Sequence, residues 1–227
     1  MTIRQIALIS TAAFLAACSA ATETAETATK TVDRAVTDVK ASVAGDAKMQ
    51  GASLAELPAG IYKSEQGHAY VAFQYSHQGY SKPIIRWGTT DATVTFDADN
   101  PENSKLTVTL PVADIDTGVS AWDDHIKAAD FFDAANHPEV TFVSTDIEQI
   151  RDGYGTVTGD LTIKGVTKPF TLTGTVNKVG KHFRSGADMF GVSATGQLKR
   201  SDFGVDKYAP MADDIEIMIE VEFQKAE

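Results

Sequence analysis

Asp214-Ile215-Glu216-Ile217-Met218-Ile219-Glu220-Val221-Glu222-Phe223, near the C-terminus, is the most informative segment about the fold. Every odd-numbered residue in it is apolar, and glutamate occupies positions 216, 220 and 222. Successive side chains of a β-strand point to opposite faces of the sheet, so the segment predicts a strand with one buried face and one solvated face. Such strands are typical of antiparallel sheets, which commonly bury only one face.

The same period of two recurs through the preceding sequence. It is clearest in residues 70–75, 93–96, 106–112 and 156–163. Turn sequences containing glycine separate these segments, and about eight strands can be counted beyond Gly60. An open sheet would leave two exposed edges, whereas closure into a barrel removes both. We therefore predict an all-β fold, an antiparallel barrel of about eight strands.

One segment breaks the alternation. A serine that could cap a helix and two aspartates behind it predict a short helix near residues 121–130. This helix carries Trp122 and Ile126, and Phe131 and Phe132 follow it directly. We expect the apolar insertion to close one end of the barrel, as a lid, as a cap that completes the core, or as both.

The N-terminus has the pattern of an export signal. Arg4 precedes an apolar run over residues 6–15, which is shorter than the ~20 residues needed to span a bilayer. The run ends in Leu15-Ala16-Ala17-Cys18, and Cys18 is the only cysteine of the chain. This ending resembles the lipobox of bacterial lipoproteins, whose cysteine is acylated and becomes the N-terminus after cleavage. The alternative is a plain secretory signal that is cut after residue 20 or 21 and discards Cys18.

We therefore expect three regions. Residues 1–17 are predicted to be a lipoprotein signal peptide, with Cys18 as the lipidation site. Residues 18–57 lack aromatic residues and proline, which predicts a tether, and a heptad-like spacing of valines leaves a short helical stalk as the alternative. Residues 58–227 form the barrel domain. Serine rather than aspartate follows Cys18, which by resemblance to lipoproteins implies a periplasmic protein anchored at the inner leaflet of the outer membrane.

Charge and spacing argue against several kinds of partner. The formal net charge is −11, with no cluster of basic residues, so we expect no nucleic-acid partner. The Asp114-x-Asp116-x-Gly118 spacing is similar to a calcium loop, but its twelfth position is His125 instead of glutamate. His68 and His77 would lie on opposite faces of one strand. We expect no metal site, no cofactor and no catalytic residue.

Several short motifs resemble those of the YceI-like family of polyisoprenoid-binding periplasmic proteins. In chain order they are Ile115-Asp116-Thr117-Gly118, Asp124-His125-Ile126-Lys127, Asp130-Phe131-Phe132-Asp133, His137-Pro138-Glu139-Val140-Thr141-Phe142, Val157-Thr158-Gly159-Asp160-Leu161-Thr162-Ile163, Gly165-Val166-Thr167-Lys168-Pro169 and Arg200-Ser201-Asp202-Phe203-Gly204. The resemblance covers residues 60–223 and implies a lipocalin-like barrel whose interior holds a long isoprenoid tail of quinone or polyprenyl type. It also implies that the chain can form a homodimer, and it carries over no enzymatic activity.

A barrel of about eight strands either fills with side chains or holds one slender ligand, and the residue pattern alone fits both. The ligand-binding residues that we predict are Phe73, Tyr75, Phe96, Val108, Trp122, Ile126, Phe131, Phe132, Phe142, Leu161, Phe170 and Phe190. On the predicted helix, Asp124, His125 and Lys127 are the candidates for contacting a head group.

The function expected from these features is enclosure of a long-chain isoprenoid lipid, for carriage or buffering beside a membrane and without catalysis. Two other classes stay open. One is a hydrolase-like enzyme that uses the region of Asp124 and His125. The other is a non-catalytic stress or interaction module with a filled core.

Overall fold

The computed structural model of this chain describes residues 51–226. The predicted signal peptide, the lipidation of Cys18 and most of the predicted tether lie outside the described residues. Within the described range, no helix combines the length and the apolar character needed to cross a bilayer. Residues 51–57, which composition placed in the tether, pack against the barrel, and Leu57 is only 2% exposed.

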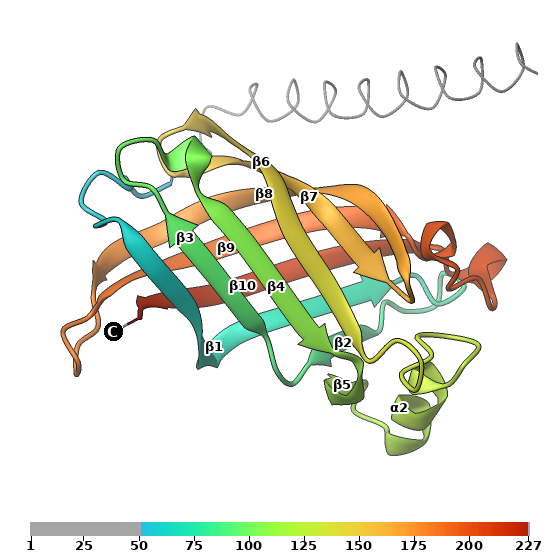
Figure 1. Ribbon diagram of the computed structural model, residues 1–227. Helices are drawn as coiled ribbons and strands as arrows, with labels where there is room; N and C mark the ends of the chain where they lie inside the picture. Colours follow the sequence, from blue (N-terminus) through green and yellow to red (C-terminus); the bar gives the residue numbers. More distant parts are fainter. Residues whose placement is uncertain (1–50, 227) are drawn as a thin grey trace, which may run out of the picture. The chain divides into compact units, whose positions relative to one another are not determined.

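The described part of the chain is built almost entirely of β-strands, with one α-helix and short 3₁₀ turns (Figure 1). The strands and the helix are β1 (Gly60–Tyr75), β2 (Ile84–Trp87), β3 (Asp91–Phe96), β4 (Lys105–Pro111), β5 (Ile115–Asp116), α2 (Ser120–Lys127), β6 (Glu139–Arg151), β7 (Tyr154–Ile163), β8 (Val166–Lys181), β9 (Asp188–Lys199) and β10 (Asp214–Lys225).

Eight of the strands close into an antiparallel ring. Their order is β1-β3-β4-β6-β7-β8-β9-β10, and β10 pairs again with β1. The segment that indicated the fold forms most of β10, and it pairs with β1 on one side and β9 on the other. Its residues Ile215, Val221 and Phe223 are buried, as their alternation predicts. The prediction of an all-β antiparallel barrel with one short helix is confirmed.

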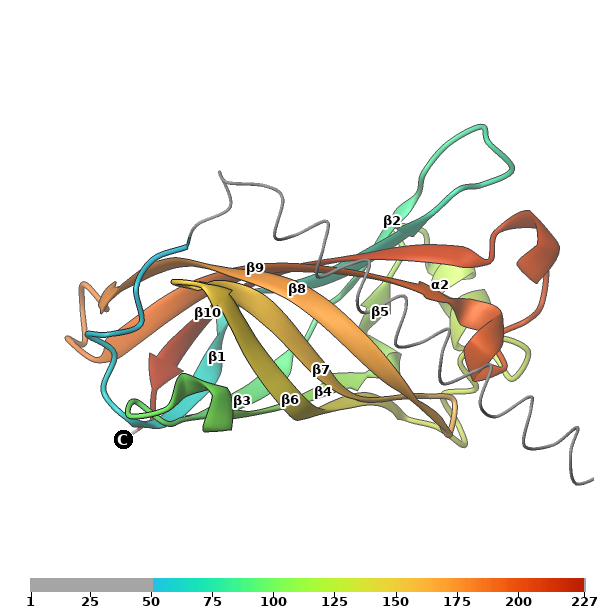
Figure 2. The ribbon, with the colours of Figure 1, turned by 90° about the horizontal axis from the view of Figure 1, so that it is seen from above.

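Strand β1 has two halves with different neighbours, and this division opens the barrel at one end. Residues 60–63 pair with β3, whereas residues 72–74 pair with β2, and β2 in turn pairs with β5. The guanidinium of Arg86 donates two hydrogen bonds to Asp116 and ties β2 to β5, at 2.8 and 3.0 Å. Figures 1 and 2 show α2, the β1–β2 loop and the segment before β10 gathered at this same end of the barrel.

The helix α2 is shorter than predicted, because it ends at Lys127 and Ala128 is already extended. The predicted serine cap is also wrong: Val119 occupies the N-cap position and makes no side-chain capping bond. Asp123 anchors the helix instead. Its carboxylate accepts hydrogen bonds from the backbone N–H and the hydroxyl of Thr117, at 2.7 and 2.6 Å, and these bonds lower the pKa of Asp123.

The end of the barrel away from α2 is filled by aromatic side chains. The rings of Phe190 and Phe223 stack at 5.0 Å, and Tyr62 packs edge-on against Phe190 at 5.4 Å and against Phe96 at 6.4 Å. Tyr62 is completely buried, and its hydroxyl donates to the carbonyl of Pro58 at 2.6 Å. Burial raises the pKa of Tyr62 to about 12. We call these four aromatic residues the plug.

Candidate functional site

A cavity of about 670 Å³ occupies the half of the barrel nearest α2. This volume is in the range of small-molecule sites, about 300–1,000 Å³. Its wall is mostly apolar, and the lining residues on the barrel strands are Val71, Ala72, Phe73, Tyr75, Val108, Leu110, Val140, Phe142, Leu161, Ile163, Phe170, Leu172, Leu198, Ile215, Ile217 and Ile219. The interpretation of a core filled throughout is therefore wrong: the barrel is filled at the plug and hollow at the α2 end.

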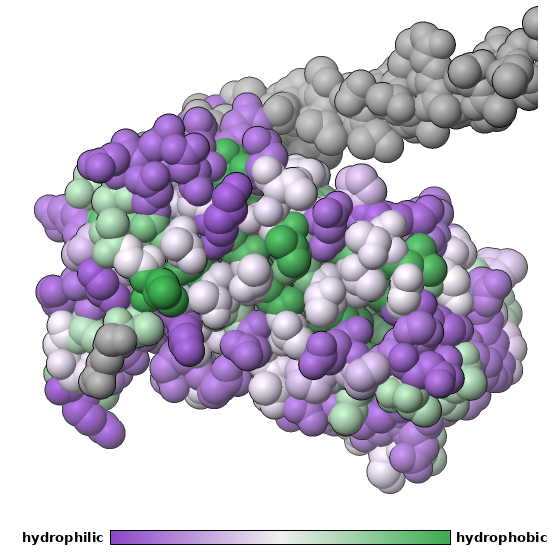
Figure 3. All heavy atoms as spheres, in the orientation of Figure 1, coloured by the Kyte–Doolittle hydropathy of each residue, from purple (hydrophilic) through white to green (hydrophobic). Residues whose placement is uncertain are grey.

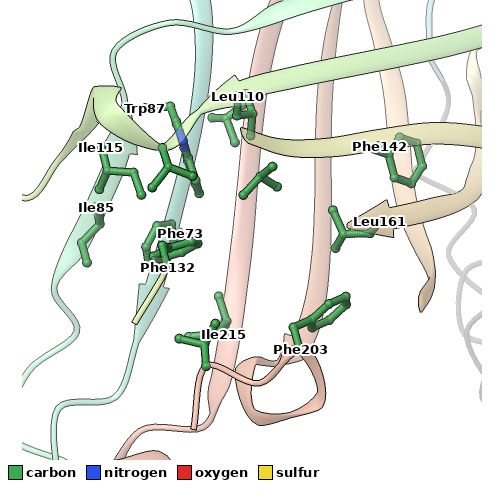
Figure 4. Close-up of a cluster of buried hydrophobic side chains, with 14 of the residues drawn as sticks. Phe73, Ile85, Trp87, Leu110, Ile115, Phe132, Phe142, Leu161, Phe203 and Ile215 are labelled. Carbon is green, nitrogen blue, oxygen red and sulfur yellow. The ribbon is translucent and has the colours of Figure 1, made fainter. Parts of the chain in front are cut away.

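Two glycines help to keep the lumen open. A Cβ atom at Gly159 would lie 2.6 Å from the ring of Phe142, and one at Gly196 would lie 2.5 Å from the ring of Phe170. The two rings therefore occupy the space that side chains on β7 and β9 would fill. Their ring centroids are 6.5 Å apart, edge to face, and both rings line the cavity. In Figure 4, Phe142 and Leu161 face the interior from the side opposite Phe73.

The helix and the two phenylalanines after it cover one side of the cavity. Trp122 and Ile126 line it from α2, and Phe131 and Phe132 line it from the segment that follows. Trp122 packs edge-on against Phe131 at 5.8 Å. Phe132 packs against Phe73 and, at 6.1 Å, against Trp87 (Figure 4). The indole N–H of Trp87 is buried and has no hydrogen-bond partner within residues 51–226.

The opening of the cavity carries its polar groups. Arg200 lines the opening and donates to the carbonyls of Ala212 and Val205, at 2.6 and 2.7 Å, and within residues 51–226 it forms no ion pair. Tyr75 lines the same region, and burial raises the pKa of its hydroxyl while the positive charge of Arg200 opposes that rise. An apolar chamber thus ends in a fixed cation and a neutral hydroxyl.

Most of the predicted ligand-binding residues meet in this cavity. Ten of them line it, namely Phe73, Tyr75, Val108, Trp122, Ile126, Phe131, Phe132, Phe142, Leu161 and Phe170. Phe96 and Phe190 do not, because they belong to the plug. The alternating pattern correctly predicted that both side chains point into the barrel, but it carries no information about how far along the barrel axis they lie.

The three predicted head-group residues do not line the cavity. Asp124 is exposed, and His125 stacks on Trp122 at 5.0 Å. In a helix, residues four apart share one face, so Trp122 and Ile126 point inward while Asp124 and Lys127 point elsewhere. The polar position that sequence reasoning missed is Arg200. Its signal was its place at the end of an alternating segment, within the last motif of the family resemblance.

The described residues offer no metal centre. Between residues 51 and 226, no three side chains of histidine, cysteine, aspartate or glutamate are grouped so as to hold a metal ion.

Comparison with known proteins agrees with this architecture. The family model described as "YceI-like domain" matches residues 62–223. A UPF0312 protein of Ectopseudomonas mendocina is 38% identical over 183 residues, which cover 80% of this chain and 94% of the relative. The crystal structure of the Campylobacter jejuni YceI protein is 34% identical, with a TM-score of 0.60 over 65% of this chain and 87% of that one.

A more distant structure shares the fold. It is a polyisoprenoid-binding domain from Saccharophagus degradans, 10% identical, with a TM-score of 0.55 over 74% of this chain and all of that one. At this identity the likeness concerns the fold alone. The matched residues begin within β1 and end within β10. The chain belongs to the YceI-like family.

Proposed function

We propose that this protein is a non-catalytic lipid carrier of the periplasm, which encloses the tail of an isoprenoid lipid of the quinone or polyprenyl type. The observation that carries the proposal is the apolar cavity of about 670 Å³ that opens at one end of the barrel and is blocked by the plug at the other. Such a chamber suits a long apolar chain that enters from one end.

The dimensions of the cavity favour a slender tail. Three alternate residues of β10, from Ile215 to Ile219, line it, and at about 3.4 Å per residue they span roughly 14 Å. The chamber is therefore deep and lined on all sides by branched aliphatic and aromatic side chains. The plug stops the tail at the depth of Phe190 and Phe223, so only part of a long polyprenyl chain fits inside.

The energetics favour carriage over permanent storage. Moving one methylene from water to an apolar site is favourable by about 0.8 kcal/mol, so a tail does not leave for water. A lipid that comes from a membrane is already in an apolar medium. Its transfer into the cavity is close to balanced, and this lets the protein both take up and release it.

The opening favours a head group that accepts hydrogen bonds. Arg200 is half-buried beside the cavity, and its two hydrogen bonds go to backbone carbonyls. Within residues 51–226 it forms no contact ion pair, and the carboxylates of Asp213 and Asp206 act on its charge only from a greater distance. A quinone carbonyl or the phosphate of a polyprenyl lipid would each find a donor there. Support for an isoprenoid ligand also comes from the fold shared with the Saccharophagus domain, whose description is polyisoprenoid-binding.

The expected lipid anchor fits this proposal. Acylation at Cys18 would hold the carrier at the outer membrane, beside its source of lipid, and two or more acyl chains are needed for stable anchoring. Labelling with a fatty-acid analogue tests the anchor directly. The label is expected on the wild type and not on a Cys18→Ala variant, and equal labelling of the two would contradict it.

Native mass spectrometry of gently purified protein tests the function. The wild type is expected to retain a neutral or phosphorylated isoprenoid, and Ile217→Trp, which fills the cavity, is expected to lose it. Met218→Trp is the matched control, because it lies on the other face of the same strand and does not line the cavity. Val108→Phe is a second, smaller filling variant. A wild type that never carries lipid, or filling variants that carry as much as the control, would contradict the proposal.

A further inference from the structure

We propose that the rim of the cavity docks onto the surface of a lipid bilayer with little net charge. The rim consists of Tyr80, Ile84, Val119, Tyr208 and Met211. This inference rests on the proposed function, since it says how a lipid reaches the cavity. The partner is the bilayer itself, and the contact is apolar.

The rim gathers most of the large apolar side chains that the described part of the chain exposes. Nine such residues are exposed, and five of them form the rim, with exposures from 49% for Met211 to 87% for Tyr80. They come from three separate segments: the β1–β2 hairpin, the turn before α2, and the loop before β10. Figure 2 shows the hairpin projecting beyond the barrel at the α2 end. Exposed apolar groups collected on one surface mark an interaction site.

The rim adjoins the cavity wall. Val119, Tyr208 and Met211 are exposed to solvent and also line the cavity, so apolar side chains connect the outer surface with the interior beside the polar groups of the opening. When a bilayer contacts this rim, a lipid tail that leaves the bilayer stays in contact with apolar side chains on its way into the cavity. Without such contact, every methylene of the tail would have to pass through water, which is prohibitive for a long tail.

The backbone holds one rim residue in an unfavourable conformation. Tyr208 has φ of +61°, in the left-handed region that non-glycine residues rarely adopt. Such strain is unfavourable and is found most often at functional sites. Here it presents an aromatic side chain that is 53% exposed, beside Phe131 at the opening. Tyrosine prefers the boundary between lipid and water, because one end of its ring is apolar and the other polar.

The charges around the rim favour a bilayer of low net charge. Both lysines of the two longer rim loops pair with carboxylates: Lys82 with Glu216 at 3.2 Å, and Lys207 with Asp130. Arg200 at the opening is then the one cation of these two loops without a contact ion pair within residues 51–226. The chain as a whole has a net charge of −11. A strongly anionic membrane surface would repel such a protein, whereas a zwitterionic surface would not.

The expected anchor does not prevent this orientation. Gly51, where the described chain begins, hydrogen-bonds to the carbonyl of Asp152 at the plug end of the barrel. Strand β10 has 12 residues and is therefore about 40 Å long, and the barrel is no longer than this because its strands tilt from its axis. About 30 residues separate Cys18 from Gly51, and a chain of that length can span up to roughly 100 Å. A protein anchored at Cys18 can therefore turn its rim toward the same membrane.

Two tryptophan probes test the docking in the full chain. Tyr80→Trp places an indole on the rim, and Phe183→Trp places one at the plug end, where the native side chain is equally exposed at 85%. Vesicles of brominated phosphatidylcholine quench an indole that enters the bilayer. We expect at least threefold stronger quenching of the rim probe, measured against the background of Trp87 and Trp122. Equal quenching of the two probes, stronger quenching at position 183, or quenching that requires anionic lipid would overturn the inference.

A transfer experiment separates this inference from the proposed function. Tyr80 and Ile84 do not line the cavity, so Tyr80→Asp with Ile84→Asp is expected to leave the amount of bound lipid unchanged. The rate at which the protein moves a fluorescent isoprenoid between phosphatidylcholine vesicles is expected to fall at least tenfold. Bound lipid with an unchanged rate overturns the docking and leaves the carrier intact. Rim quenching in a protein that never binds lipid overturns the carrier and leaves the docking intact.

Discussion

The ring of Phe170 lies where a side chain on Gly196 would be: a Cβ atom at position 196 would be 2.5 Å from Cζ of the ring. Phe170 comes from β8 and Gly196 from β9, so this glycine lets an aromatic residue lie against the neighbouring strand. On the outer surface of the barrel, side chains extend into solvent and need no glycine to make room for them. This surface is largely hydrophilic in the view of Figure 3, with hydrophobic residues gathered in a band across the middle. The interior stays hollow because the large aromatic rings lie against glycines on the neighbouring strands.

Gly196→Ala is expected to shrink the cavity and destabilise the barrel. The added methyl group would push the Phe170 ring into the lumen, and overpacking of this kind costs about 1–3 kcal/mol. Bound lipid per protein and the free energy of unfolding in urea both measure the effect. Gly191→Ala is the matched control on the same strand, since nothing lies within 4 Å of its added Cβ. Equal stability and lipid content in the two variants would show that Phe170 has room to move.

The architecture was accessible from sequence because alternation is a local signal. Every second residue of β10 from Ile215 to Phe223 is apolar, and the strand needs no distant information to show which face is buried. Depth is different, because it depends on strand register across the whole barrel. Phe170 and Phe190 look alike in the sequence, yet one lines the cavity and the other belongs to the plug.

The polar end of the site was harder to predict for a related reason. Asp124, His125 and Lys127 were predicted to contact the head group because they form a cluster of polar residues on a helix that closes the barrel. The orientation of an eight-residue helix is set by its apolar residues, and Ile126 takes the buried position. Arg200 reaches the opening from a 3₁₀ turn that follows β9, and nothing local in the sequence places that turn beside Tyr75.

Tyr62 of the plug is expected to make the free energy of unfolding fall at alkaline pH. The pKa of Tyr62 is about 12 in the folded chain against a reference value of 10.0, so the folded state holds this proton more tightly. The resulting stabilisation is fully present below pH 10 and is lost as the pH rises from about 10 to 12. The free energy of unfolding is expected to fall more steeply in this window for the wild type than for Tyr62→Phe. At pH 8 the variant lacks the bond to Pro58 and is expected to be about 1 kcal/mol less stable. Parallel pH profiles would show that Tyr62 titrates normally.

Asp123 is expected to control the order of α2 in acid. The bonds from Thr117 lower the pKa of this carboxyl, so its contribution is present above the usual aspartate pKa and is lost as the pH falls through the lowered value. Asp123→Ala is expected to raise amide hydrogen exchange over residues 117–127 at neutral pH, and the wild type is expected to do so only in acid. Asp124→Ala is the control, because Asp124 is exposed on the same helix. Equal exchange in both variants would mean that packing of Ile126 alone orders the helix.

Arg200 is expected to select the head group more than the tail. Arg200→Gln removes the cation at the opening and leaves the apolar wall unchanged, so bound lipid should persist with a shift from phosphorylated to neutral head groups. The carbonyls of Val205 and Ala212 lose their donor, which costs about 1–3 kcal/mol, so the melting temperature should fall by several degrees. Mass spectrometry of the bound lipids separates the two effects. Lys199→Gln serves as the control, since Lys199 is exposed and pairs with Asp214 outside the cavity. If Arg200→Gln lowers stability but leaves the composition of bound lipids the same as in this control, the arginine only stabilises the loop before β10 and does not select the head group.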